Sequence, residues 1–314
     1  MANDTDLPMP TPTIPNKPLP SFKTLSFDIY ETLIQWESSI IQHLSPLLSS
    51  LPEDSPFKNA ATTDPVARQA LSNLFATHEK KLQSTFPTKS YPLILEQAYI
   101  RTANDVLLKS NNSHADHPGT TPDSHPDSDL DIETLAHTFG QSVGSWPAFP
   151  DTLSAMTRLS RHYRLIALSN VDRRSFHQTL SGPLAGIPFW RIFTAEDVGS
   201  YKPSHANFEY LFNHLERGHQ DGDDDQKESG QGGQGTSTGA STSRFDNLHV
   251  AQSLHHDHVP CKALGVPSVW INRSGAGTGR SEFRQLHEKR EVGYGWRFGT
   301  LQEFADEVDR EYAL

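Results

Sequence analysis

The chain has 314 residues, a length that predicts about two domains or one domain with a large insertion, and 35% of its residues are hydrophobic. Its net charge of −11 at pH 7 argues against nucleic acid and anionic membrane surfaces as partners, because both are bound through clustered Lys and Arg. Its single cysteine, Cys261, excludes an intramolecular disulfide and cysteine-rich zinc modules, which favours a reducing, intracellular setting.

Residues 1–20 are rich in proline and contain no apolar core segment. Proline denies the backbone both hydrogen-bond donors and helical geometry, so we expect a disordered tail here. The segment lacks the apolar region of a secretory signal, and no stretch elsewhere approaches the roughly 20 apolar residues of a membrane span. The sequence therefore predicts a cytoplasmic protein.

Short apolar runs that end on polar residues alternate with helical patterns over much of the chain. The run Lys23–Asp28 ends on a carboxylate, and the run Arg164–Asn170 ends on a serine and an asparagine. Further strand patterns lie at Ile192–Thr194, Asn247–Ala251 and Ser268–Asn272, and helical patterns at Thr152–His162, Ser204–Leu215 and His258–Leu264. This alternation predicts an α/β fold with a Rossmann-like parallel sheet covered by helices.

Residues 38–145 interrupt the alternation, because they contain helical patterns and almost no strand signal. These patterns cover Ile40–Leu51, Pro65–Leu82, Tyr91–Leu108 and Ile132–Phe139. Since the block lies between the first two strands, we expect an inserted helical cap over their carboxyl ends, with the core formed by 21–37 and 146–314. Residues 111–129 and 217–245 have few apolar side chains, so we expect a flexible loop in the cap and a disordered insertion in the core.

Asp28 is the first candidate for chemistry, because it closes an apolar strand and has a hydroxyl, Thr32, four positions later. A carboxylate held at a strand-to-loop turn by backbone N–H groups and a hydroxyl is a competent nucleophile. The alternative is an aspartate that only caps the next turn. Later segments place further polar groups in chain order, Ser169 and Asn170, then Lys202-Pro203, then Asp257.

This order of polar residues around a helical insertion resembles the haloacid dehalogenase superfamily of hydrolases. Within it, the first motif of the type II 2-haloacid dehalogenases reads Asp-x-Tyr-Gly-Thr-Leu, and residues 28–33 of this chain read Asp-Ile-Tyr-Glu-Thr-Leu. The next four residues, Ile-Gln-Trp-Glu at 34–37, are similar to the fungal branch of that group. The resemblance implies a small-molecule substrate bound between core and cap.

The resemblance implies a reaction in two steps. Asp28 displaces halide to form an aspartyl ester, and water then attacks the ester carbonyl and regenerates Asp28. Lys202 would pair with Asp28 and hold its pKa down, and Asp257 would orient the lysine or the water. The substrate-binding residues that it implies are Tyr30, Thr32, Ser169, Asn170 and Phe208. Neither step needs a metal or another cofactor, and a homodimer is a possible assembly, because members with this kind of cap often look dimeric.

Two alternatives stay open. A Mg²⁺-dependent phosphatase of the same superfamily carries a second aspartate two residues after the nucleophile and acidic residues in its fourth motif, where this chain has Tyr30 and Gln252. A tyrosine with a pKa of about 10 is a poor acid, and an amide brings no charge to Mg²⁺.

The other alternative is a binding or scaffold protein that has lost small-haloacid turnover. Phe208 lacks the family's tyrosine hydroxyl, Leu254 replaces an asparagine, Glu31 replaces a glycine, and the cap arginine of the family has no clear match.

Four histidines, His249, His255, His256 and His258, crowd the fourth motif. Imidazole is a ligand of zinc and copper, yet no cysteine and no sustained i, i+4 pairing supports a closed metal site. We expect these histidines to face loops or partners, and one of them can serve as an acid or base near Asp257.

Overall fold

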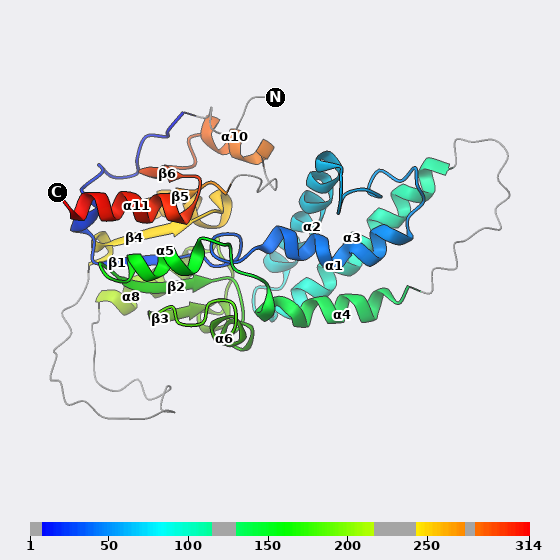
Figure 1. Cartoon of the computed structure of the whole chain (residues 1–314), viewed down its shortest axis with the longest axis horizontal. Helices are drawn as coiled ribbons and strands as arrows, with labels where there is room; N and C mark the ends of the chain where they lie inside the picture. The colour runs from blue at the N-terminus through cyan, green and yellow to red at the C-terminus, as the bar shows by residue number, and fades with distance from the viewer. Residues whose placement is uncertain (1–7, 115–129, 217–242, 274–279) are drawn as a thin grey trace.

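The computed structural model describes residues 8–114, 130–216, 243–273 and 280–314. A sheet region and a helical region lie next to each other along the long axis (Figure 1). The sheet contains β1 (Thr24–Phe27), β2 (Arg164–Ser169), β3 (Phe189–Thr194), β4 (Asn247–Ala251), β5 (Ser268–Ile271) and β6 (Trp296–Phe298). All neighbouring strands are parallel, in the order β3-β2-β1-β4-β5-β6. The predicted α/β fold with a Rossmann-like parallel sheet is confirmed.

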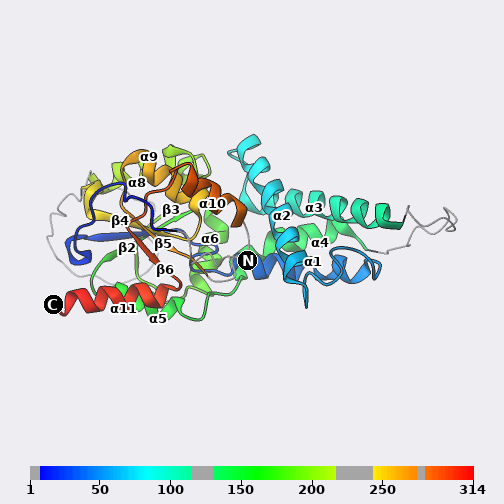
Figure 2. The same cartoon turned by 90° about the horizontal axis from the view of Figure 1, so that it is seen from above.

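Helices cover both faces of this sheet, with α5 and α11 on one side and α8 and α9 on the other (Figure 2). The helices of the core are α5 (Thr152–Leu159), α6 (Arg173–Ser181), α7 (Ala195–Val198), α8 (His205–Glu216), α9 (Val259–Leu264), α10 (Arg280–Glu288) and α11 (Leu301–Tyr312). The strands β1, β4 and β5 are buried along their whole length, as expected of parallel strands with helices on both faces. The sequence patterns did not predict β6 or α11.

A helical bundle, called the cap from here on, is inserted between β1 and β2. It consists of α1 (Trp36–Ser50), α2 (Pro65–Thr85), α3 (Tyr91–His114) and α4 (Ile132–Ser142). The predicted boundary between residues 37 and 38 falls inside α1. The predicted loop at 111–129 and insertion at 217–245 lie mostly outside the described residues, although 111–114 belong to the end of α3. None of the helices in the described part of the chain is long and apolar enough to cross a membrane.

The chain passes twice between core and cap, and the two passages are hydrogen-bonded to each other. The backbone N–H of Gln35 donates to the carbonyl of Pro147 at 2.8 Å, and the N–H of Phe149 donates to the carbonyl of Leu33 at 3.0 Å. We call the segments from Leu33 to Gln35 and from Pro147 to Phe149 the neck. The neck joins the loop after β1 to the segment that leads into α5.

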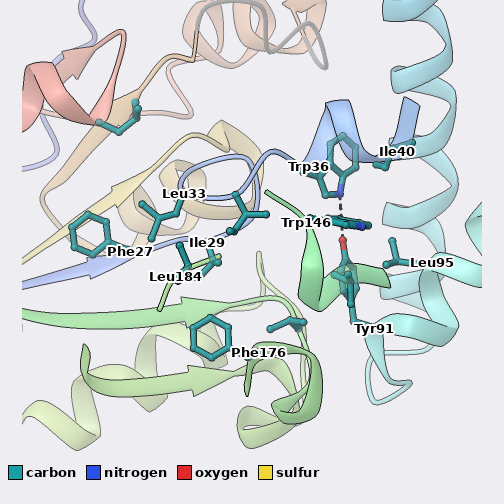
Figure 3. Close-up of a cluster of buried hydrophobic side chains, with 14 of the residues drawn as sticks. Phe27, Ile29, Leu33, Trp36, Ile40, Tyr91, Leu95, Trp146, Phe176 and Leu184 are labelled. Carbon is teal, nitrogen blue, oxygen red and sulfur yellow. Dashed lines mark hydrogen bonds between the residues drawn. The ribbon is translucent and has the colours of Figure 1, made fainter. Parts of the chain in front are cut away.

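One hydrophobic cluster runs from the sheet through this junction into the cap. Figure 3 shows Phe27 on the core side, Leu95 on the cap side, and Trp146 between them. The indole N–H of Trp36 donates to the hydroxyl of Tyr91 at 3.3 Å. Large buried aromatic side chains contribute most to packing energy, so this shared cluster fixes the cap against the core.

Residues 11–20 lie against the core, which corrects the expected disordered tail over 1–20 for this part of the segment. The backbone N–H and the hydroxyl of Thr13 both donate to the carbonyl of Gly293, at 2.7 and 2.9 Å. Leu19 is fully buried. The expectation of disorder rested on the hydrogen-bond donors that proline lacks. The hydrogen bonds that hold this segment are made with residues near the far end of the chain, and composition does not reveal such contacts.

Candidate active site

The carboxyl ends of β1, β2 and β4 meet at one edge of the sheet, below the cap. Asp28 follows β1, Asn170 follows β2, and Asp257 lies in a π-helical turn after β4. In parallel sheets this edge is where ligands bind. Asp28, Asn170, Lys202 and Asp257 line one cavity of about 850 Å³, together with residues of α2. The structure therefore gathers the predicted catalytic residues in one place.

Lys202 is the centre of this cluster. Its ammonium Nζ lies 2.8 Å from Asp28 Oδ1 and 2.7 Å from Asp257 Oδ1, and it donates to the carbonyl of Leu168 at 2.9 Å. An ammonium has three N–H donors, and each of them has a partner here. The side chain is 1% exposed. A single buried cation is thus shared by two carboxylates.

Burial and pairing act in opposite directions on these groups. Burial is the largest influence on Asp28 and raises its pKa above the ordinary value, although Lys202 and Thr32 lower it. Burial also disfavours the charged forms of Asp257 and Lys202, but pairing prevails there. Lys202 and His249 hold the pKa of Asp257 well below its usual range, and the two carboxylates raise the pKa of Lys202. The expectation that Lys202 holds down the pKa of Asp28 describes a real effect, but burial outweighs it.

Two residues predicted to bind substrate contact the catalytic residues, and one of them, Asn170, also lines the cavity. Thr32 Oγ1 donates to Asp28 Oδ2 at 2.7 Å and accepts from the backbone N–H of Gln252 at 2.9 Å. The amide of Asn170 holds the backbone of Lys202 from both sides, because its Oδ1 accepts from the N–H at 2.7 Å and its Nδ2 donates to the carbonyl at 3.1 Å. Both side chains therefore orient the catalytic residues.

The sequence matches no protein-family model and no curated protein. Solved structures do match it. The L-2-haloacid dehalogenase from Xanthobacter autotrophicus with chloropropionic acid covalently bound is 11% identical, with a TM-score of 0.54 over 92% of this chain and 98% of that chain. The defluorinating L-2-haloacid dehalogenase Rha0230 is 11% identical, with a TM-score of 0.59 over 94% and 100%. The HAD-hydrolase YfnB from Bacillus subtilis, bound to magnesium, is 13% identical, with a TM-score of 0.55 over 92% and 99%.

This chain has the haloacid dehalogenase fold. The order of motifs along the sequence predicted that fold, and the structural likeness to L-2-haloacid dehalogenases confirms it. The closer likeness to a fungal branch stays a prediction.

Within the haloacid dehalogenase fold, the other predicted substrate-binding residues divide into one that lines the cavity and two that do not. Tyr30 lines the cavity, and its hydroxyl lies 2.8 Å from the hydroxyl of Thr179. Ser169 is buried, and its hydroxyl has no hydrogen-bond partner among the described residues. Phe208 is fully buried under the sheet, with its ring centroid 5.0 Å from that of His249. The predicted contact of Phe208 with substrate is therefore corrected, because α8 turns this side chain into the core.

A buried polar chain extends from Asp257 into the sheet through His249. We expected the histidines of this segment to face loops or partners, with one of them near Asp257, but His249 is fully buried and lies beside Asp257. His249 Nε2 lies 2.9 Å from Asp257 Oδ1, and His249 Nδ1 lies 2.8 Å from the hydroxyl of Ser26. The amide of Asn247 donates to the same hydroxyl at 2.9 Å. Ser26 thus links Asn247 to one ring nitrogen of His249, and the other ring nitrogen faces Asp257. His249 thus positions Asp257.

Glu31 stands where the motif of the haloacid dehalogenase family has glycine. Its φ of 71° lies in the left-handed region that favours glycine. Its Oε2 accepts from the backbone N–H groups of Trp36 and Glu37, at 2.9 Å each, in the first turn of α1. Burial raises the pKa of Glu31 to about 7. This carboxyl group therefore joins the nucleophile's loop to the start of the cap.

We expect Glu31→Gln to be more stable than the wild type above pH 7 and equally stable near pH 4. Glu31 ionises near 4.5 in the unfolded chain but near 7 in the folded one, so the wild type loses up to about 3 kcal/mol as the pH rises between these values. Urea unfolding of both proteins from pH 4 to pH 8 measures the difference, with exposed Glu209→Gln as the control. A difference that does not change with pH would contradict the raised pKa.

Proposed function

We propose that the protein is a hydrolase that cleaves the carbon–halogen bond of a 2-haloacid or a related small molecule through a covalent ester on Asp28. The observation that carries this proposal is the placement of Asp28. It follows the central strand β1, lines the cavity, and forms an ion pair with buried Lys202 at 2.8 Å. The structural likeness to a dehalogenase with chloropropionic acid covalently bound supports the same chemistry.

In the first step, a carboxylate oxygen of Asp28 attacks the substrate carbon. The new carbon–oxygen bond forms as the carbon–halogen bond breaks, and the halide leaves with the bonding electrons. Halide needs no proton to leave, so this step has no need of the general acid that a phosphatase uses. Lys202 and Thr32 hold the carboxylate in one orientation, which is a contribution of geometry to the rate.

In the second step, water attacks the ester carbonyl of Asp28. Asp257 Oδ1 lies 2.7 Å from the Lys202 ammonium, whose other carboxylate partner is Asp28. Asp257 therefore orients the lysine beside the ester. Attack by water gives the hydroxy acid, a proton that leaves to solvent, and Asp28 in its original form.

The residues at this edge fit a magnesium ion poorly. Mg²⁺ prefers several charged or water oxygens in octahedral geometry. Here the Oδ1 atoms of Asp28 and Asp257 already share the Lys202 ammonium, and the neighbouring Gln252 offers a neutral amide. We therefore propose a reaction without a metal or another cofactor.

The test is chloride release from L-2-chloropropionate by the purified protein in the presence of EDTA. We expect release that EDTA does not change. In a single turnover in H₂¹⁸O with enzyme in excess, we expect the label in the Asp28 peptide and not in the lactate, because water attacks the aspartyl carbonyl. A chromogenic phosphate ester with Mg²⁺ is the control substrate. Phosphate release without chloride release would favour the phosphatase, and release of neither would favour a binding protein.

A further inference from the structure

A further buried carboxyl group lines the same cavity, on the side of the cap. Glu79 of α2 is 7% exposed and lines the cavity together with Asp28. Its Oε1 accepts from the hydroxyl of Tyr91 at 2.6 Å and from the amide of Gln83 at 3.3 Å. Its Oε2 has no hydrogen-bond partner in the part of the chain that the structure describes. Glu79 therefore presents a fixed carboxyl group with one oxygen still available.

No cation among the described residues forms an ion pair with Glu79. Lys80, the next residue in the chain, only lowers its pKa electrostatically, while burial raises that pKa to about 7. The phenols of Tyr91 and Tyr201 also interact with Glu79, and they carry no charge near neutral pH. An unpaired carboxyl group in a cavity disfavours an anion beside it and favours a group that donates a hydrogen bond or carries positive charge.

An aromatic wall connects Glu79 with the nucleophile's loop. The ring centroids of Tyr30 and Tyr91 are 6.1 Å apart, and the indole of Trp36 donates to the Tyr91 hydroxyl. Figure 3 shows Trp36 and Tyr91 at the junction of core and cap. All three aromatic residues line the cavity of about 850 Å³, a volume in the range of roughly 300–1,000 Å³ found for drug-sized ligands. The cavity thus has an aromatic side that runs from the loop of Asp28 to Glu79.

We propose that Glu79 binds a hydroxyl or ammonium group at the far end of the substrate. The reacting carbon then lies at Asp28, and an apolar stem lies along Tyr30 and Tyr91. The inference rests on the proposed function, because it assigns the second half of the same cavity. It names a substrate class, the halogenated acids with a terminal hydrogen-bond donor, that is longer than a three-carbon haloacid.

Binding of unreactive acids tests this inference without any chemistry. The probes are hexanoate, 6-hydroxyhexanoate and 6-aminohexanoate, titrated into the protein in a calorimeter. We expect the wild type to bind one or both substituted acids at least tenfold more tightly than hexanoate. Glu79→Met removes the acceptor and should abolish this preference, whereas the exposed cap variant Glu133→Gln should keep it. Glu79→Gln should lose the preference for the ammonium and keep that for the hydroxyl, which distinguishes the two groups.

Proton release gives a second readout, which a merely structural role for Glu79 would not change. At pH 6.5, an ammonium bound beside Glu79 favours its ionised form, so binding of 6-aminohexanoate should release protons. Titrations in buffers with different ionisation enthalpies measure that release, and Glu79→Gln should show none. Equal affinities for all three acids in the wild type, or a preference that persists in Glu79→Met, would overturn the inference.

Reactive acids with and without the terminal ammonium group distinguish a failure of this inference from a failure of the proposed function. The probes are 2-bromohexanoate and 6-amino-2-bromohexanoate, assayed for bromide release. A binding preference without bromide release from either acid would reject the proposed chemistry and keep the Glu79 site. Bromide release at equal rates, with equal binding, would keep the chemistry and reject the Glu79 site.

Discussion

Asp28→Asn is expected to lower halide release at least about 10⁴-fold, because the amide is a far weaker nucleophile than the carboxylate and no ester can form. The asparagine has nearly the same shape, and its Oδ1 can still accept from Lys202 or Thr32. We therefore expect a folded protein that binds substrate. Ion chromatography measures the halide, and thermal unfolding checks the fold.

The control for this variant is its mass. Deamidation of the introduced asparagine would restore the aspartate nucleophile, so intact mass is measured before and after the assay. Activity within tenfold of the wild type, in protein whose mass still shows the amide, would contradict the role of Asp28 as nucleophile.

Lys202→Met is expected to destabilise the protein by about 3–5 kcal/mol and to abolish halide release. It leaves the buried carboxyl groups of Asp28 and Asp257 close together without their shared cation, and removing one partner of a buried ion pair is strongly destabilising. The loss should shrink as the pH falls, because protonation of either carboxyl group relieves the repulsion. Urea unfolding at pH 8 and pH 5 measures both effects.

The matched control is Lys23→Met. Lys23 also pairs with an aspartate at 2.9 Å, but its side chain is 65% exposed. An exposed ion pair is worth about 0–1 kcal/mol, so we expect a small loss that changes little between the two pH values. A Lys202→Met variant as stable as this control would contradict the charge arrangement at the centre of the site.

The sequence could predict which polar residues lie together at the end of the sheet, because two physical rules combine. An apolar run that stops on a polar residue marks the end of a buried strand, and the carboxyl ends of parallel strands meet at one edge. These rules, with the motif order, led to Asp28, Lys202 and Asp257 as neighbours. Substrate binding by Thr32 and Asn170 stays a prediction, since residue type alone does not tell whether a polar group faces substrate or another residue of the protein.

The link from Asp257 to Ser26 could not be read from the sequence, because it depends on strand register. Ser26 and His249 are direct partners across β1 and β4, although they are 223 positions apart in the chain. A pattern of alternating residues shows which face a side chain takes, but not which residue stands opposite it. The hydrogen bonds of Thr13 to Gly293 escaped prediction for the same reason, since both contacts join distant parts of the chain.

The neck ties the two crossings of the chain together, because Ile34 and Ala148 form an antiparallel bridge with backbone hydrogen bonds beside it. A second tie joins core and cap elsewhere, since the hydroxyl of Tyr201 donates to the carbonyl of Lys89, between α2 and α3, at 2.6 Å. These contacts and the shared hydrophobic cluster hold the cap in one position against the sheet. The cavity is therefore preorganised, so a ligand does not lose binding energy to the ordering of a separate domain.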